Sequence, residues 1–324
     1  MVKAGIFLLA RFFPALSGTP EWVWLVSSAG LITLLLGAYV ALFKHDLKGL
    51  LAYSTLSHLG LITLLFGFSS ELALVAAIFH IINHATFKGS LFMVAGIIDH
   101  ESGTRDMRKL NGLFKMMPHT AVLAMIAAAA MAGVPLLNGF LSKEMFFEQA
   151  ISASGTPLAI WTIPALVTLA AIFSVAYSLR FIHDVFFNGD PIDLPKTPHE
   201  PPRFMKIPVD ILVVLCLLVG IAPMYLISPI LTVAVASSLQ TAAPEFSLAI
   251  WHGFNIPLLM SFIALVLGVA VYTMRHRLFA WNEKGLHSLD GKAFLIGYCG
   301  NLSVCRKKLP MPSIKPPYNQ QLRG

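Results

Sequence analysis

The sequence is poor in charged residues. Asp, Glu, Lys and Arg make up only 12% of its 324 residues, whereas hydrophobic residues make up 56%. A soluble domain carries about 25% charged residues, so this composition excludes an ordinary soluble protein. Long apolar runs are typical of helices that cross a bilayer. The sequence therefore predicts an all-α integral membrane protein.

Cysteines and cofactor motifs are also scarce. The three cysteines, Cys216, Cys299 and Cys305, are too few and too scattered for a disulfide framework, and none forms a Cys-x-x-Cys pair. The sequence also lacks the Gly-x-Gly-x-x-Gly pattern of dinucleotide-binding proteins. We therefore expect no cofactor and no metal site. We also expect any redox chemistry in a complex to reside in other subunits.

The net charge of +7 does not indicate a nucleic-acid-binding protein. The excess of basic residues arises largely in the C-terminal tail, and no basic patch with interleaved aromatic residues marks a soluble domain. Basic residues beside apolar helices are attracted to anionic lipid headgroups. We therefore expect the basic loops to contact lipid, and we expect no nucleic-acid partner.

Seven segments reach the roughly 20 apolar residues that a spanning helix needs. An eighth, 1–13, is too short, is followed by Pro14, and predicts an N-terminal half-span. We divide the chain into a remnant helix and loop (1–21), a transmembrane repeat (22–187), a cytoplasmic loop (188–207), further transmembrane helices (208–274) and a basic, proline-containing tail (275–324). The seven predicted spans are 22–43, 47–68, 72–98, 120–149, 158–181, 208–238 and 254–274.

Basic residues fall on one side of these spans. If each segment crosses once, one face receives 19 of the 23 Lys and Arg residues, and the loops on the opposite face receive none. Because basic loops stay in the cytoplasm, we expect this face and the C-terminal tail to be cytoplasmic. The four basic residues outside these loops are Lys3 and Arg11 in the half-span, and Lys88 and Lys143 within apolar segments.

The fourth span is predicted to be a broken helix. Gly133, Pro135 and Gly139 cluster in its middle, and a proline removes a backbone hydrogen bond and disturbs the preceding turn. Lys143 follows this break, where transporters commonly place ion sites. An alternative is a packing kink in which Lys143 extends to the surface beside Glu144.

Three titratable residues form a row on the third span. His80, His84 and Lys88 are spaced four residues apart, so they share one helix face. Histidine exchanges protons near neutral pH, and a buried ionisable residue usually marks an ion or proton path. The alternative is a hydrogen-bonded seam between helices. A metal site is disfavoured because no HExxH glutamate or cysteine accompanies the histidines.

Two further residues are weaker candidates for the same path. His58 lies near the middle of the second span, in a patch of small hydroxyl residues that more often mediate helix packing. Lys48 lies with Asp46 at the cytoplasmic edge, where a lysine usually extends toward the membrane surface.

Three long stretches carry a resemblance to a known family. They read HDLKGLLAYSTLSHLG, FHIINHATFKGSLFMVAGIIDHESGTRD and MAGVPLLNGFLSKEMFFEQA. They resemble the antiporter-like subunits shared by respiratory complex I and Mrp-type multisubunit Na+/H+ antiporters. Within this family, their residues are most similar to those of the large A subunit of the Mrp type.

The resemblance implies a fold and roles for these residues. The family has two inverted repeats of five helices, each with a broken helix that carries a lysine. This chain is similar to the second repeat, so the first is expected before residue 1, and we expect an internal fragment or truncated form. Lys143 matches the lysine of the second broken helix. Lys48 matches the charged residue of the preceding channel half, and His80, His84 and Lys88 match the connecting axis.

The expected function is that of one subunit of a monovalent cation/proton antiporter, and not of an enzyme. The expected ions are Na+ and H+, the expected partners are other membrane subunits, and the expected location is the bacterial plasma membrane. Two alternatives stay open: a proton-translocating subunit of an NADH–quinone oxidoreductase, or an inactive truncated scaffold. The chain alone is expected to insert into the membrane without exchanging Na+ for H+.

Overall fold

The computed structural model describes residues 2–153, 157–251 and 253–285, and every regular element in these ranges is helical. The chain divides into two units, Met1–Thr273 and Met274–Gly324. The all-α prediction is confirmed. The helices are α1 (Ala4–Leu16), α2 (Pro20–Phe43), α3 (Leu47–Gly67), α4 (Glu71–Ser102), the 3-10 helix η1 (Leu113–Lys115), α5 (Pro118–Ala132), α6 (Asn138–Ser152), α7 (Pro157–Phe186), α8 (Arg203–Ile221), α9 (Pro223–Leu226), α10 (Ser228–Leu239), α11 (Ile256–Thr273) and, in the second unit, α12 (Arg275–Gly285).

Local sequence signals set where the long helices begin and end. The side chains of Thr19, Asp46 and Ser70 accept hydrogen bonds from backbone N–H groups in the first turns of α2, α3 and α4. Such caps satisfy donors that the start of a helix leaves unpaired. Helix α4 ends at Ser102 and is capped by Gly103, whose φ of 73° is in the left-handed region that glycine adopts readily.

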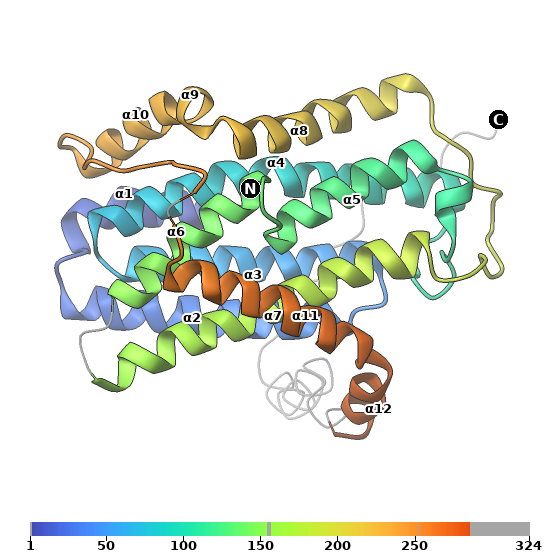
Figure 1. The fold of residues 1–324 in the computed structure, drawn as a ribbon, viewed down its shortest axis with the longest axis horizontal. Coiled ribbons are helices and arrows are strands. Elements are labelled where there is room, and N and C mark those ends of the chain that lie inside the picture. The colour runs from blue at the N-terminus through green and yellow to red at the C-terminus, as the bar shows by residue number, and fades with distance from the viewer. Residues whose placement is uncertain (1, 154–156, 252, 286–324) are drawn as a thin grey trace, which may run out of the picture. The chain divides into compact units, whose positions relative to one another are not determined.

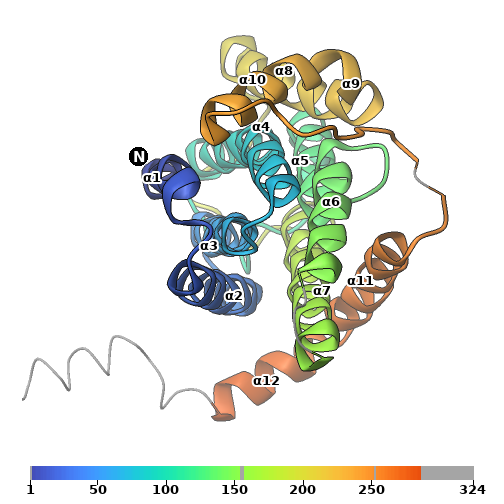
Figure 2. The same ribbon diagram turned by 90° about the vertical axis from the view of Figure 1, so that its left-hand side faces the viewer.

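Six helices in the described ranges are long and apolar enough to cross a membrane: α2, α3, α4, α7, α8 and α11. They run broadly along one direction (Figure 1). Helices α3 and α4 occupy the interior of the first unit: α2 packs on α3, α3 on α4, and α4 on α8 (Figure 2). Helices α5, α6 and α7 close the side of this stack, and α11 packs on α7. The residues that form the candidate site come from this interior.

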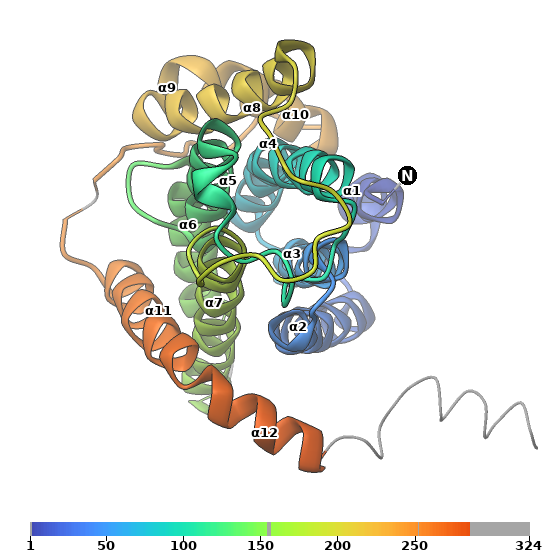
Figure 3. The same ribbon diagram turned by 90° about the vertical axis from the view of Figure 1, so that its right-hand side faces the viewer.

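The basic loops gather at one end of the first unit, as the span parity predicts (Figure 3). Backbone hydrogen bonds join these loops. The N–H of Leu47 donates to the carbonyl oxygen of Arg105, and the N–H of Met107 donates to that of His45. The N–H of Ile192 donates to the carbonyl oxygen of Lys109. At the opposite end, Ser70 Oγ donates a hydrogen bond to Gln149 Oε1 at 3.1 Å. Residues 120–149 therefore run once from one end of the bundle to the other, through α5 and α6.

Several boundaries differ from those predicted, and α8 begins at Arg203, inside the predicted loop 188–207. Pro14 does not end the first helix: α1 continues through it to Leu16. The predicted span 208–238 is three helices, because the chain breaks at Ala222 (φ −135°, ψ 55°), directly before Pro223, and again at Ile227 (φ −110°, ψ −33°). The residue before a proline disfavours helical geometry, which accounts for the break at Ala222. Residues 275–285, predicted as tail, form α12.

Candidate ion pathway

The predicted helix break lies between α5 and α6. Helix α5 ends at Ala132 and is capped by Gly133, whose φ of 86° is left-handed, and Pro135 lies in the connection that follows. The start of α6 approaches the end of α5 closely, since a Cβ on Gly139 would lie 1.8 Å from the carbonyl oxygen of Ala130. A larger residue at Gly139 would force the two half-helices apart. The break predicted around Gly133, Pro135 and Gly139 is confirmed.

Lys143 folds back onto this break. Its side chain is 6% exposed, and its Nζ donates to the carbonyl oxygen of Ala132 at 2.8 Å and to Ser174 Oγ at 3.2 Å. The last carbonyls of a helix lack partners within the helix and carry partial negative charge. The end of α5 is therefore a ready acceptor for an ammonium group. Lys143 is held inside the protein, rather than extended to the surface as the alternative required.

His80 of the predicted row pairs with His58 from the neighbouring helix. The two rings are stacked, with 5.2 Å between centroids and 17° between planes. His58 Nδ1 lies 3.0 Å from His80 Nε2, and His80 Nδ1 lies 3.0 Å from Ser142 Oγ on α6. On its other side, His58 Nε2 lies 3.5 Å from the Tyr177 hydroxyl on α7. Side chains from four helices thus meet through two imidazoles.

Lys88, two turns beyond His80 along α4, contacts α3. Its Nζ donates to Ser54 Oγ, and more weakly to the carbonyl oxygen of Leu51 at 3.5 Å. Lys88 is 4% exposed. A buried lysine that contacts a hydroxyl and a carbonyl oxygen inside a membrane protein is unusual and often marks an ion or proton path.

The ring of His84 lies between these two contacts. Its ring centroid is 5.3 Å from that of His58, and both of its ring nitrogens are buried and have no hydrogen-bond partner within the described part of the chain. The predicted row is therefore buried as one face of α4, with His80 and Lys88 bonded to different neighbours and His84 packed between them.

A small cavity is lined by both Lys143 and His58. Its volume is about 20 Å³, and its wall combines apolar side chains with the polar side chains of Ser57, His58, Lys143, Ser174 and Tyr177. A polar cavity of roughly 10–15 Å³ or more can hold one water molecule. Lys143 and His58 thus line the same water-sized space.

Lys48 and Asp99 form an ion pair at the basic end, with 2.6 Å between Nζ and Oδ2. Both side chains are about one-third exposed, at 37% and 32%. Lys48 thus stands at the solvent end of α3, whose interior carries Ser54 and His58.

A second ion pair lies in the adjoining loop. The Arg108 guanidinium donates hydrogen bonds to Asp106 and holds the pKa of that carboxyl below its usual value.

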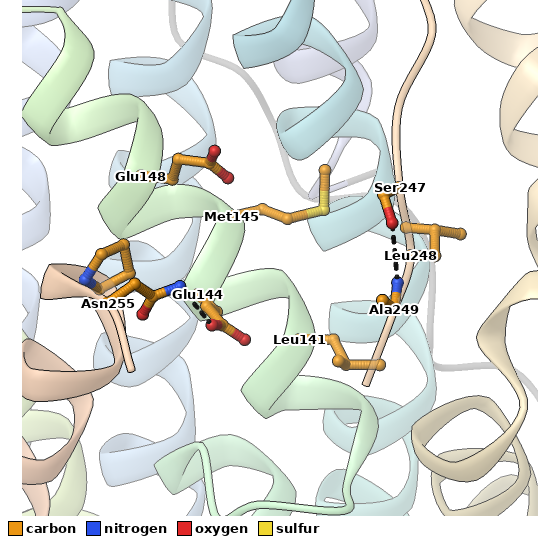
Figure 4. Close-up of a pocket in the computed structure, with 9 residues that line it drawn as sticks. Leu141, Glu144, Met145, Glu148, Ser247, Leu248, Ala249 and Asn255 are labelled. Atoms are coloured by element: carbon orange, nitrogen blue, oxygen red, sulfur yellow. Dashed lines mark hydrogen bonds between the residues drawn. The ribbon is translucent and has the colours of Figure 1, made fainter. Parts of the chain in front are cut away.

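Glu144 faces a different space from its neighbour Lys143. It is buried, and Oε1 accepts a hydrogen bond from Asn255 Nδ2 at 3.3 Å (Figure 4). Together with Glu148 and Ser247 it lines a cavity of about 170 Å³ near the end opposite the basic loops. The structure therefore separates the two residues that the sequence places side by side.

Four polar residues of the site were not among the predicted pathway residues. Ser142, Ser174 and Tyr177 contact the histidines or Lys143. Lys3 donates from Nζ to the carbonyl oxygen of Ile81 at 2.9 Å, between His80 and His84 on α4. For Lys3 the available signal was the same as for Lys88, an ionisable group within an apolar segment.

Comparison with known proteins identifies the family of the chain. The family described as the membrane region of NADH:quinone oxidoreductase and Mrp antiporters matches residues 1–171. The chain belongs to this family. It is 62% identical over 286 residues to the A/B subunit of a probable K(+)/H(+) antiporter of Rhizobium meliloti, covering 88% of this chain and 28% of that protein. It is 41% identical to the A subunit of a Na(+)/H(+) antiporter of Alkalihalophilus pseudofirmus, covering 85% of this chain and 37% of that protein.

A solved structure gives the same result at the level of the fold. A chain of the Mrp complex from Dietzia sp. superposes with a TM-score of 0.79 and 36% identity, over 96% of this chain and 34% of that chain. The present chain thus spans 28–37% of the lengths of these three proteins. It is a membrane protein related to antiporter subunits over most of its own length.

Proposed function

We propose that this chain is a proton-translocating part of a multisubunit monovalent cation/proton antiporter. Protons move between Lys143 and Lys88 through the histidines of α3 and α4. The observation that carries this proposal is the pairing of His58 with His80 beside Lys143, a buried lysine held at a helix break. Unwound backbone at membrane depth is tolerated where it is buried in protein or lines a cavity, and transporters use such breaks to hold ions.

Each candidate residue has a role in this scheme. Lys143 and Lys88 are the proton-binding sites at the two ends of the buried segment, because a lysine amine can bind and release a proton. His58 and His80 carry the proton between them, and His84 lines their path. Lys48 with Asp99 forms the entrance at the basic end. Glu144 lines the cavity near the end opposite the basic loops.

An antiporter is favoured over an oxidoreductase subunit. Both curated relatives described above are named for their place in antiporters, and the Mrp complex chain aligns over 96% of the present chain. One relative is named for K(+) and the other for Na(+). The proposed co-substrate is therefore a monovalent cation, with Na+ and K+ both to be assayed.

The proposed setting follows from the same relatives and from the basic loops. The partners are other membrane subunits, and the location is the bacterial plasma membrane. The end that carries the basic loops faces the cytoplasm, where anionic lipid headgroups attract it.

The test is cation-driven collapse of a pH gradient in everted membrane vesicles. Vesicles that contain the complete assembly with this chain are compared with vesicles from which only this chain is absent. We expect Na+ or K+ to dissipate the gradient only in the first set. Equal dissipation in both sets would contradict the proposal.

A further inference from the structure

The hydroxyl of Ser142 lies at one end of a chain of contacts through both histidines. Ser142 Oγ lies 3.3 Å from the carbonyl oxygen of Gly139 and 3.5 Å from that of Asn138, so acceptors on its own helix lie within reach of its single proton. When that proton points to its own helix, Ser142 accepts from His80 across the 3.0 Å contact to Nδ1. That arrangement places the His80 proton on Nδ1.

The donor and acceptor roles of His58 and Tyr177 follow from the position of the proton on His80. With its proton on Nδ1, neutral His80 accepts at Nε2, so the donor across the 3.0 Å contact is His58 Nδ1–H. His58 Nε2 is then an acceptor, and the group that faces it is the Tyr177 hydroxyl at 3.5 Å. All the bonds point the same way, from α7 through α3 and α4 to α6.

Resting on the proposed function, we infer that Tyr177 is the proton-transfer residue that joins Lys143 to the histidine pair, with His58 and His80 both in the Nδ1–H form. Tyr177, Lys143 and His58 line the same cavity, whose volume of about 20 Å³ accommodates one water molecule. Ser174, one turn before Tyr177 on α7, holds Lys143 Nζ at the edge of this cavity.

The transfer conserves protons and leaves all bonds between heavy atoms unchanged. The Lys143 ammonium releases one proton to the water. The water and the Tyr177 hydroxyl each accept one proton and release one, and His58 gains one at Nε2. The positive charge thus moves from Lys143 to the imidazole pair. The phenol is suited to this step because it can accept and donate at once.

The tautomers are tested directly on the assembled complex. Nitrogen-15 NMR of histidine-labelled protein in nanodiscs distinguishes the Nδ1–H form from the Nε2–H form, and His58→Asn and His80→Asn variants assign the two signals among the 11 histidines. We expect both neutral rings to be protonated at Nδ1. An Nε2–H form at either ring would overturn the inference.

Transport is tested with two variants that each remove one hydroxyl from α7. Tyr177→Phe deletes the donor to His58. Ser178→Ala is the matched control, because Ser178 is the next residue, is equally buried and bonds only to the carbonyl of Ser174 among the described residues, outside the cavity. We expect Tyr177→Phe to lower the exchange rate about tenfold or more, as is usual for loss of a positioned proton-transfer group, and Ser178→Ala to retain it.

A parallel Lys143→Ala variant separates the two proposals. If Lys143→Ala is inactive while Tyr177→Phe exchanges at the wild-type rate, the role of Tyr177 is wrong and the proposed function stands. If Lys143→Ala itself exchanges normally, the proposed function fails. Should Tyr177→Phe not accumulate in the membrane, the tautomers of the wild-type protein decide the inference alone.

Discussion

Lys143 Nζ donates a hydrogen bond to the carbonyl oxygen of Ala132, 11 residues earlier in the chain, at 2.8 Å. The acceptor is the last residue of α5 and the donor lies in the second turn of α6. The lysine thus bridges the two halves of the broken helix. A change in its charge alters the attraction that holds the half-helices together, because a cation is stabilised at a helix C-terminus and a neutral amine much less so.

Replacing Lys143 with Arg should abolish exchange, although it keeps the positive charge. A guanidinium does not lose its proton in proteins, so it can hold the end of α5 but cannot release a proton. The measurement is the exchange rate in vesicles at matched protein abundance. Exchange at the wild-type rate would show that Lys143 acts only as a structural cation.

Replacing Gly133 with Ala should weaken both the fold and transport. An alanine at the observed φ of 86° costs about 1–2 kcal/mol, and its Cβ would lie 2.8 Å from Lys143 Cδ, which must move. We expect a lower melting temperature and slower exchange. Gly96→Ala on α4 is the control, because a Cβ there meets nothing within 4 Å. Equal effects at both positions would contradict this account of the break.

Substituting His58 or His80 with Gln should slow exchange about tenfold or more, since each carries a proton between hydrogen-bonded neighbours. His100→Gln and His119→Gln serve as controls, because their side chains are 66% and 48% exposed near the basic end. His84→Gln is expected to cost less than the first two, since its ring nitrogens have no hydrogen-bond partner in the described ranges. A uniform loss at all five positions would argue against a specific path.

Removing the ion pair at the basic end should affect transport more than stability. An exposed or half-exposed salt bridge is worth about 0–1 kcal/mol, so Lys48→Ala should barely change the melting temperature. If the pair forms the proton entrance, the variant slows exchange while abundance is unchanged. Thermal unfolding and exchange rate, measured on the same preparation, decide between an entrance and a surface ion pair.

Features that depend on one helix alone could be predicted from the sequence. The break followed from Gly133 and Pro135, and the shared face of His80 and Lys88 followed from helical spacing. The separation of Lys143 from Glu144 was also foreseeable, because adjacent residues on a helix point about 100° apart.

Contacts between helices that are far apart in the sequence could not be predicted in this way. Tyr177 meets His58 across 119 positions of sequence, and its role depends on how α7 packs against α3. A serine or tyrosine in an apolar helix has no sequence signal that separates a proton path from helix packing. The break before Pro223 was missed because the residues on both sides form one continuous apolar run.

In the proposed mechanism, protons pass through Lys143. The most direct test is Lys143→Ala in the complete assembly, with exchange followed by the collapse of the pH gradient on addition of Na+ or K+. We predict that the variant chain reaches the membrane at wild-type abundance and that exchange with both cations is lost. Wild-type exchange by that variant would contradict the claim.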